Sequence, residues 1–347
     1  MGRPAVDEYE ASLERFPNRL MERWFINLAR VGVVLTLVVV TMGAWVRLTD
    51  AGLGCPDWPG CYGRLIVSES ISADPEAAAL LAERPLETGK AWREMIHRFS
   101  ATMIGVISIF LVVLAIKFRK RPGQPFVLPM LLLPLVIFQG LLGMWTVTLK
   151  LFPPVVMSHL VGGFSIAAVF FWLSRSRSSA APMRSHPRLK ALGLAAGAAL
   201  ILQIFLGGWT SANYAALACP DFPTCQTEWW PDLADFGAGF DLAQPVGPDY
   251  EGGLLDHPAR VAVHFAHRLG AIVATLLLGL LIWRLWVSPG GRTAGAAVAV
   301  ALVAQIGIGI SIVLFGVPLA VAVAHNGVAA ILLLTVINAN QRIWQTG

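Results

Sequence analysis

Eight long apolar runs alternate with polar segments along this chain of 347 residues. A helix that crosses a bilayer needs about 20 predominantly apolar residues, and each run has about that length. The predicted spans are 25–46, 95–116, 127–148, 154–173, 191–211, 261–286, 294–316 and 319–340. The pattern therefore predicts an all-α membrane protein with eight transmembrane helices, the last two joined by a tight turn around Gly316 and Pro318.

Positive charge is concentrated after the even-numbered spans. The residues concerned are Lys117, Arg119, Lys120, Arg121, Arg175, Arg177, Arg184, Arg188, Lys190, Arg284, Arg292 and Arg342. The segment 212–258 instead holds eight acidic residues and no Lys or Arg. Since loops rich in Lys and Arg stay in the cytoplasm, both termini are expected there, including the tail 341–347. The long loops 48–93 and 212–258 are expected on the outer, periplasmic side.

The composition agrees with a membrane protein. Hydrophobic residues make up 56% of the chain and charged residues 14%, against about a quarter charged in soluble domains. The net charge of +5 does not indicate a nucleic-acid partner, because the basic residues lie in short loops where topology accounts for them. Four acidic residues in the first twenty argue against a signal or transit peptide. We therefore expect residues 1–24 to be a cytoplasmic tail of a bacterial plasma-membrane protein.

The order of distinctive residues in the first half recurs in the second. Each half has a glycine near the end of its first span, two cysteines, a His-Arg pair, a glutamine and a histidine. The two series are Gly43, Cys55, Cys61, His97, Arg98, Gln139, His159 and Gly207, Cys219, Cys225, His267, Arg268, Gln305, His325. Four spans per half give both halves the same orientation, with a pseudo-twofold axis along the membrane normal. We expect two four-helix bundles, 25–174 and 191–340, joined by a basic cytoplasmic linker, 175–190.

Four histidines lie at similar depth in predicted spans, all near the outer side. His97 and His159 belong to the first half, and His267 and His325 to the second. An ionisable residue inside a membrane helix suggests a function, and neutral imidazoles are good axial ligands of haem iron. The alternative is a hydrogen-bonded histidine in the core. Zinc fits less well, because it needs three or four protein ligands.

The residues beside these histidines differ between the halves. Glu94 precedes His97 by three residues, whereas His264 stands at that position before His267. Residues three apart share a helix face, so Glu94 could move protons at a site beside His97, or could simply favour the helix start. Arg98 and Arg268, and also Arg47, are candidates for contacts with haem propionates, or else extend to the outer interface.

The four cysteines form two pairs in the outer loops, Cys55 with Cys61 and Cys219 with Cys225. Facing an oxidising compartment, such pairs most often form disulfides. A redox role for Cys55 and Cys61 is the main alternative, and a four-cysteine zinc site does not suit this spacing.

Several stretches resemble the haem A synthase family, whose members oxidise a methyl group of haem o to the formyl group of haem A. They are Arg47-Leu48-Thr49 through Gly52-Leu53, the cysteine pairs, Glu94-Met95-Ile96-His97-Arg98, Ser158-His159, His267-Arg268 and Ala324-His325-Asn326. The resemblance extends over nearly the whole chain, and the four histidines in two halves are its most specific part. The segment 66–90 matches no motif.

The resemblance implies a role for each half. His97 and His159 would bind the substrate haem o and release haem A, and His267 and His325 would bind a permanent haem b. Glu94 matches a glutamate important for catalysis, which proceeds by two successive hydroxylations of one methyl group. His264 is not among the ligands implied. The partners implied are haem O synthase, a farnesyltransferase that makes the substrate, and haem-copper oxidase assembly; the electron donor is not identified.

Three other functions use parts of the same pattern. A dihaem b-type electron-transfer cytochrome would need the four histidines but not Glu94. A proton-coupled transporter usually has a site near the bilayer midplane, unlike the outer clustering here. A thiol–disulfide relay would depend on the cysteines and not on the histidines.

Overall fold

The computed structural model describes residues 4–176 and 186–345, with side chains from Arg23 onward. Most of the predicted linker 175–190, with Arg177 and Arg184, lies outside the described residues. The described part contains helices and no β-strand. They are α1 Pro4–Leu48, η1 Glu69–Ala73, η2 Pro75–Ala77, α2 Ala78–Glu83, α3 Thr88–Lys117, α4 Val127–Thr148, α5 Pro153–Ser174, α6 Pro187–Ala212, α7 Phe236–Gly239, α8 His257–Val287, α9 Arg292–Leu314 and α10 Leu319–Trp344.

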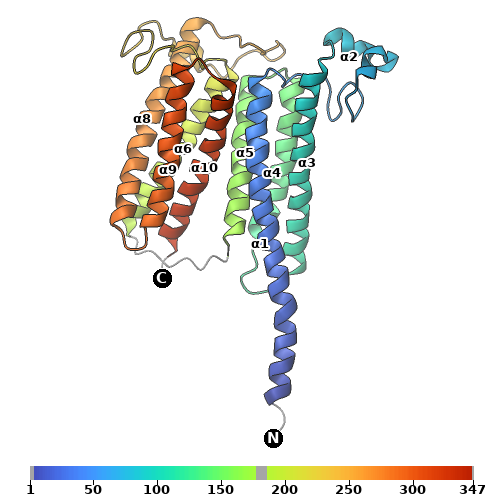
Figure 1. Ribbon diagram of the computed structural model, residues 1–347, viewed down its shortest axis with the longest axis vertical. Helices are drawn as coiled ribbons and strands as arrows, with labels where there is room; N and C mark the ends of the chain where they lie inside the picture. Colours follow the sequence, from blue (N-terminus) through green and yellow to red (C-terminus); the bar gives the residue numbers. More distant parts are fainter. Residues whose placement is uncertain (1–3, 177–185, 346–347) are drawn as a thin grey trace.

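Eight of these helices are long and apolar enough to cross a membrane. They coincide with the eight predicted spans, so the all-helical, multi-pass architecture is confirmed. The helix of the first span continues into the segment expected to form the tail, because α1 runs unbroken from Pro4 to Leu48 and projects beyond the other helices (Figure 1). Strong helix formers such as Glu, Ala, Leu and Arg in this segment favour that continuation.

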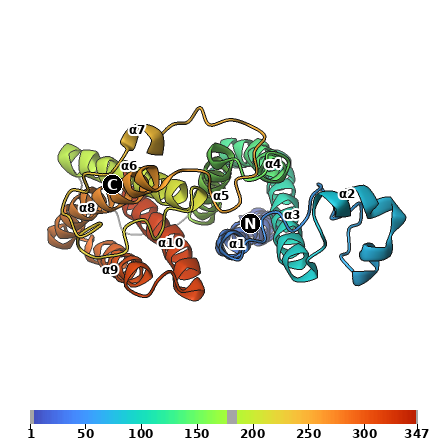
Figure 2. The same cartoon turned by 90° about the horizontal axis from the view of Figure 1, so that it is seen from above.

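The long helices form two closed rings of four. In one ring α1 contacts α3 and α5, and α4 contacts α3 and α5; in the other α6 contacts α8 and α10, and α9 contacts α8 and α10. The rings meet through α1 with α10, α5 with α6, and α5 with α10. Figures 1 and 2 show the rings side by side, and Figure 1 shows both chain ends opposite the long loops.

Matching helices of the two rings end in the same way. The N–H groups of Ala51 and Ala215 donate to the carbonyl five residues back in α1 and α6, at 3.0 and 2.9 Å. The residue before each, Asp50 or Tyr214, has a positive φ. This is the Schellman arrangement, which satisfies free carbonyls at a helix end. The predicted turn between α9 and α10 is also present, with Gly316 at φ 67°.

The segment 66–90, for which the sequence offered no motif, folds as a small helical unit. Val67, Ile71 and Ala77 are buried against Tyr62 and the Cys55–Cys61 disulfide. Hydrogen bonds from Arg64 lower the pKa of Asp74. Figures 1 and 2 show this unit, which includes α2, extending sideways beyond α3.

The second long loop crosses onto the first ring. Tyr250 is buried against Leu53 and Leu151, and its N–H donates to the Lys150 carbonyl at 3.0 Å. Arg84 of the helical unit forms an ion pair with Glu251. The two outer loops are therefore packed together over the first ring.

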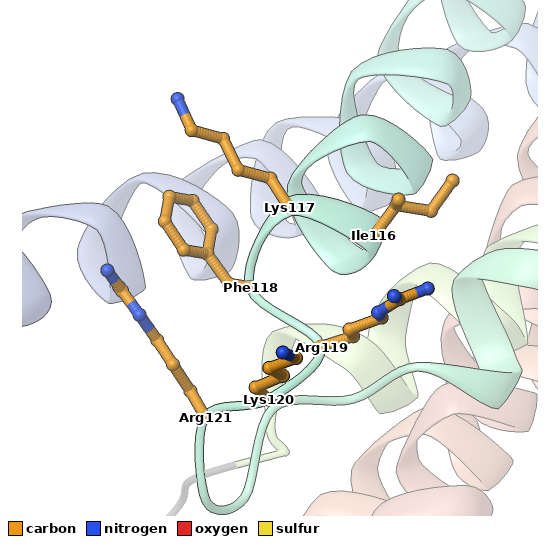
Figure 3. A pocket seen from close by; sticks show the side chains of 6 residues that line it. All are labelled: Ile116, Lys117, Phe118, Arg119, Lys120 and Arg121. Carbon is orange, nitrogen blue, oxygen red and sulfur yellow. The ribbon is translucent and has the colours of Figure 1, made fainter.

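The basic turn after α3 lies at the opposite end of the helix. Residues Ile116 to Arg121 line an open hollow there, and their side chains spread in several directions (Figure 3). The Arg121 guanidinium lies 3.9 Å from the centre of the Phe118 ring. The positive charge that oriented the second span is thus on the far side from the disulfide loops.

Candidate functional site

His97 and His159 meet inside the first ring of helices. They lie on α3 and α5, which both contact α1 and α4 and so stand diagonally across the ring. Their imidazole centres are 6.5 Å apart, with the rings inclined at 71°. With metal–imidazole bonds of about 2 Å, two imidazoles on opposite sides of one metal have centres about 6 Å apart. The pair is therefore spaced as two axial ligands would be.

His267 and His325 have the equivalent places in the second ring. They lie on α8 and α10, again diagonal, because both helices contact α6 and α9. In each half the two predicted histidines thus lie on diagonal helices of one ring, and their role as a ligand pair stays a prediction.

Each histidine ring rests on a glycine of a neighbouring helix. A methyl group on Gly43 or Gly207 would lie 3.1 Å from Cε1 of His97 or His267. On Gly143 or Gly309 it would lie 3.2 or 3.0 Å from Cε1 of His159 or His325. These contacts are tighter than ordinary van der Waals distances, so glycine at each position lets the ring reach the interior.

The buried ring nitrogens fit a prosthetic group better than a bare metal ion. Nδ1 of His97, His159 and His325 is buried without a hydrogen-bond partner, an arrangement that proteins rarely leave unexplained. Within residues 4–176 and 186–345 no group of three or more His, Cys, Asp or Glu could hold a metal. Zinc would therefore lack protein ligands here, whereas a haem supplies four of its own nitrogens and needs only two histidines.

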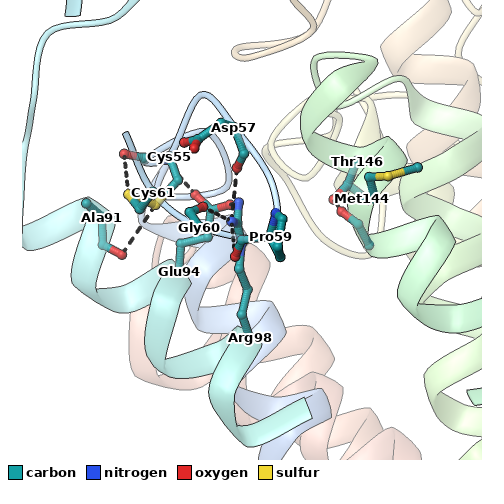
Figure 4. A network of polar contacts seen from close by, with 12 residues as sticks. Cys55, Asp57, Pro59, Gly60, Cys61, Ala91, Glu94, Arg98, Met144 and Thr146 are labelled. Carbon is teal, nitrogen blue, oxygen red and sulfur yellow. Dashed lines mark hydrogen bonds and ion pairs between the residues drawn. A yellow bond between two sulfur atoms is a disulfide. The ribbon is translucent and has the colours of Figure 1, made fainter. Parts of the chain in front are cut away.

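Glu94 joins α3 to the first disulfide loop (Figure 4). It is 4% exposed, and its Oε2 accepts the Cys55 N–H at 2.9 Å while its Oε1 accepts from Arg98 at 2.5 Å. Arg98 also donates to the carbonyls of Asp57 and Gly60, at 3.0 and 2.5 Å. The carboxylate thus sits at the mouth of the ring, one turn before His97, with both oxygens engaged.

His264 has the same position in the second ring. The Cys219 N–H donates to its Nδ1 at 3.2 Å, and Nε of Arg268 lies 3.3 Å from its Nε2. Arg268 donates to the carbonyls of Thr224 and Cys219, at 2.6 and 2.8 Å. A carboxylate can accept from both donors, whereas a neutral imidazole has one acceptor nitrogen. His264 therefore replaces Glu94 as the attachment of the loop, with less capacity to accept.

Both cysteine pairs are disulfide-bonded in the structure, Cys55 with Cys61 and Cys219 with Cys225. The predicted pairing is confirmed. All four sulfur-bearing residues are buried, beneath the loop that Arg98 or Arg268 holds. Each disulfide closes a hairpin over the mouth of its ring.

Arg47 connects the two halves. It donates to the Ser211 carbonyl at the end of α6 at 2.7 Å, and its guanidinium lies 3.8 Å from the centre of the Tyr214 ring. Burial raises the pKa of Tyr214. The three arginines proposed as propionate contacts thus all have main-chain carbonyl partners, and a propionate contact for them stays a prediction.

Comparison with known proteins bears on this arrangement. The family model COX15-CtaA, described as "Cytochrome oxidase assembly protein", matches residues 27–337. This chain belongs to that family. A "Heme A synthase" of Shewanella oneidensis is 45% identical over 320 residues, covering 91% of this chain and 96% of the relative. Proteins of the same name from Rhizorhabdus wittichii and Halalkalibacterium halodurans are 30% and 28% identical, covering 91% and 90% of this chain.

In this family member three glutamines also reach the histidines. Gln139 donates to the His159 carbonyl at 2.6 Å, and Nε2 of Gln305 lies 3.2 Å from Nε2 of His325. Nε2 of Gln203 lies 3.0 Å from Nδ1 of His267. The repeat marked Gln139 and Gln305 in the sequence. It could not mark Gln203, because the matching residue of α1 is Val39.

Proposed function

We propose that this chain is a haem A synthase, an oxidoreductase that converts a methyl group of haem o to a formyl group. The product, haem A, goes to haem-copper terminal oxidases. Relatives named "Heme A synthase" that align over nine-tenths of the chain support this function. The observation that carries it is the pair of histidine rings facing each other at 6.5 Å across the first helix ring.

The two rings of helices have different roles in this proposal. His97 and His159 bind haem o as axial ligands during the reaction, and His267 and His325 bind a permanent haem b. Haem b, when bound, supplies one-electron transfer. The unpartnered buried Nδ1 atoms and the glycine beneath each imidazole support both assignments.

Glu94 is the proposed catalytic residue. It lies on the same face of α3 as His97 and is almost fully buried, so its carboxylate can accept or release a proton at a site from which water is excluded. Arg98 and the Cys55 N–H hold that carboxylate in place. The second ring has His264 there and no carboxylate, which favours chemistry in the first ring during two successive hydroxylations.

The halves 25–174 and 191–340 are proposed to be related by a pseudo-twofold axis along the membrane normal. The contact of α1 with α10 has its counterpart in that of α6 with α5, and α5 with α10 would lie on the axis. The Lys- and Arg-rich turns support a cytoplasmic position for both termini in a bacterium. The disulfide loops then lie on the oxidising periplasmic side of the plasma membrane.

The proposed partners follow from the substrate and the product. Haem O synthase supplies haem o, and haem-copper oxidase assembly receives haem A. The family description, a cytochrome oxidase assembly protein, supports the second partner. Contacts of Arg47, Arg98 and Arg268 with haem propionates are retained as a prediction beside their carbonyl contacts.

The experiment that tests the function is identification of the haems in the purified protein. The protein is expressed with and without haem O synthase, extracted, and its haems are separated by chromatography. Haem b alone without the partner enzyme, and haem b with haem o, its hydroxylated form or haem A with it, are expected. Haem b alone in both preparations would favour a dihaem electron-transfer cytochrome, which uses the same four histidines.

A further inference from the structure

The two helix rings differ in what contacts two equivalent imidazoles, that of His97 on α3 and that of His267 on α8. In the second ring, Nε2 of Gln203 lies 3.0 Å from Nδ1 of His267 and donates to the His267 carbonyl at 3.1 Å. In the first ring, Nδ1 of His97 is buried without a partner. One imidazole is therefore held by a side chain and the other is not.

The difference originates at two matched positions. Gln203 stands four residues before Gly207, and Val39 stands four residues before Gly43. Those two glycines pack equally, at 3.1 Å, against Cε1 of His267 and His97, so Gln203 and Val39 are equivalent. Val39 is buried and has no group that can bond a ring nitrogen.

Space for the glutamine comes from Gly270. A methyl group on Gly270 would lie 2.4 Å from Oε1 of Gln203 and 2.6 Å from Cδ1 of Leu206. Any other residue would displace the amide. The first ring has Ser100 at the matching position, three residues after His97. The pair Gln203 and Gly270 in the second ring thus corresponds to the pair Val39 and Ser100 in the first.

The remaining glutamines, Gln139 and Gln305, also differ in what they contact. Nε2 of Gln305 lies 3.2 Å from Nε2 of His325, whereas Gln139 is bonded to the main-chain carbonyl of His159. Nδ1 is buried without a partner in both of these imidazoles.

An outer hydrogen bond fixes the orientation and tautomer of a ligating imidazole. A ligating imidazole needs an acceptor at Nδ1–H, and Oε1 of Gln203, which is buried without a partner of its own, supplies that acceptor when the amide is turned over. Among the described residues, His267, in the second ring, is therefore the one haem-site histidine whose Nδ1 is contacted by a side chain.

We infer that Gln203, accommodated by Gly270, is a positioning residue that fixes His267 and makes the second ring retain its haem. Val39 and Ser100 leave His97 unfixed, so that the haem of the first ring exchanges, as a substrate and a product must. The inference rests on the proposed function for the identity of the bound group. It adds the reason why one site holds a permanent haem and the other turns over.

Haem release from the full-length protein tests this without measuring catalysis. The wild-type protein loaded with haem b is mixed with excess apomyoglobin, and transfer is followed by absorbance. Two phases are expected, the slow one from the second ring. Gln203→Met, nearly the same size but unable to bond Nδ1, should speed the slow phase about tenfold, within the range for loss of such outer contacts. It should also shift the low-spin ferric signal in electron paramagnetic resonance.

Two further variants complete the test. Gln139→Met removes a first-ring glutamine bonded only to the main-chain carbonyl of His159. It should leave both phases within about twofold of wild type, because no contact with an imidazole is lost. Val39→Gln with Ser100→Gly should slow the fast phase. Wild-type rates and an unchanged resonance signal in Gln203→Met, or an unchanged fast phase in the double variant, overturn the inference even if haem A is made. A wild-type protein that makes no haem A overturns the function instead.

Discussion

Glu94 and His264 have the same place in the two helix rings, each accepting the N–H of the first cysteine of a disulfide hairpin. The distances are 2.9 Å for Glu94 with Cys55 and 3.2 Å for His264 with Cys219. Each also faces the arginine four residues later, which binds carbonyls of the same hairpin. The side chain at this position thus holds the hairpin in both helix rings. In the first ring it is a carboxylate and can also take part in the reaction.

Replacing Glu94 by glutamine distinguishes its structural role from its proposed catalytic role. Glu94→Gln keeps one acceptor for the Cys55 N–H and loses the ability to exchange a proton. We expect wild-type haem content and at least a hundredfold loss of haem A formation, since general acid–base groups contribute about 10²–10⁴ in rate. His264→Gln is the matched control and should leave haem A formation nearly unchanged. Haem A formation at the wild-type rate in Glu94→Gln would return Glu94 to a purely structural role.

Adding a methyl group to a glycine that packs against an imidazole should reduce haem binding in that helix ring only. Gly43→Ala should displace His97 and reduce the haem o bound, leaving haem b in place. Gly207→Ala should displace His267 and reduce haem b. The measurement is haem extraction from each variant expressed with haem O synthase.

Gly140 and Gly279, which also lie in membrane spans, serve as controls, because a methyl group on either meets nothing within 4 Å. Alanine at those positions should leave both haems at wild-type levels. Equal haem loss in the Gly43 and Gly207 variants would contradict independent sites.

The disulfides should stabilise the hairpins without taking part in turnover. Linking two cysteines with a sequence separation of 6 is worth about 2 kcal/mol in the entropy model, so Cys55→Ser with Cys61→Ser should lower the thermal midpoint. Hydrogen bonds from Arg98 still hold the hairpin, and haem A formation should persist at reduced temperature. Complete loss of haem A formation with both haems still bound would instead favour a thiol–disulfide reaction.

The length of the apolar runs made the membrane spans predictable. Contacts between residues in distant segments could not be predicted in this way. The helical unit at 66–90 has no run long enough to predict, because Val67 and Ile71 are buried only by packing on Tyr62 and a disulfide. The carbonyl partners of Arg98 and Arg268 depend on the path of each hairpin. Sequence spacing gave no information on that path and left a propionate as the obvious partner.

The candidate site was predictable to the extent that it repeats. His97, His159, His267 and His325 were found because each has a counterpart at equal depth, and their pairing follows from helices that stand diagonally. Gln203 was missed because its counterpart is Val39, and a search for repeated residues cannot find a residue that breaks the repeat. Differences between matched positions carry the information on which ring does what.

The measurement that tests the account most directly is the haem content of four single variants, His97→Ala, His159→Ala, His267→Ala and His325→Ala. Each is expressed with haem O synthase, and thermal unfolding shows that each is folded. We predict that the first two lose haem o and haem A but keep haem b, and that the last two lose haem b. Undiminished haem b in both His267→Ala and His325→Ala, or the same loss from all four variants, would contradict two separate histidine-paired sites.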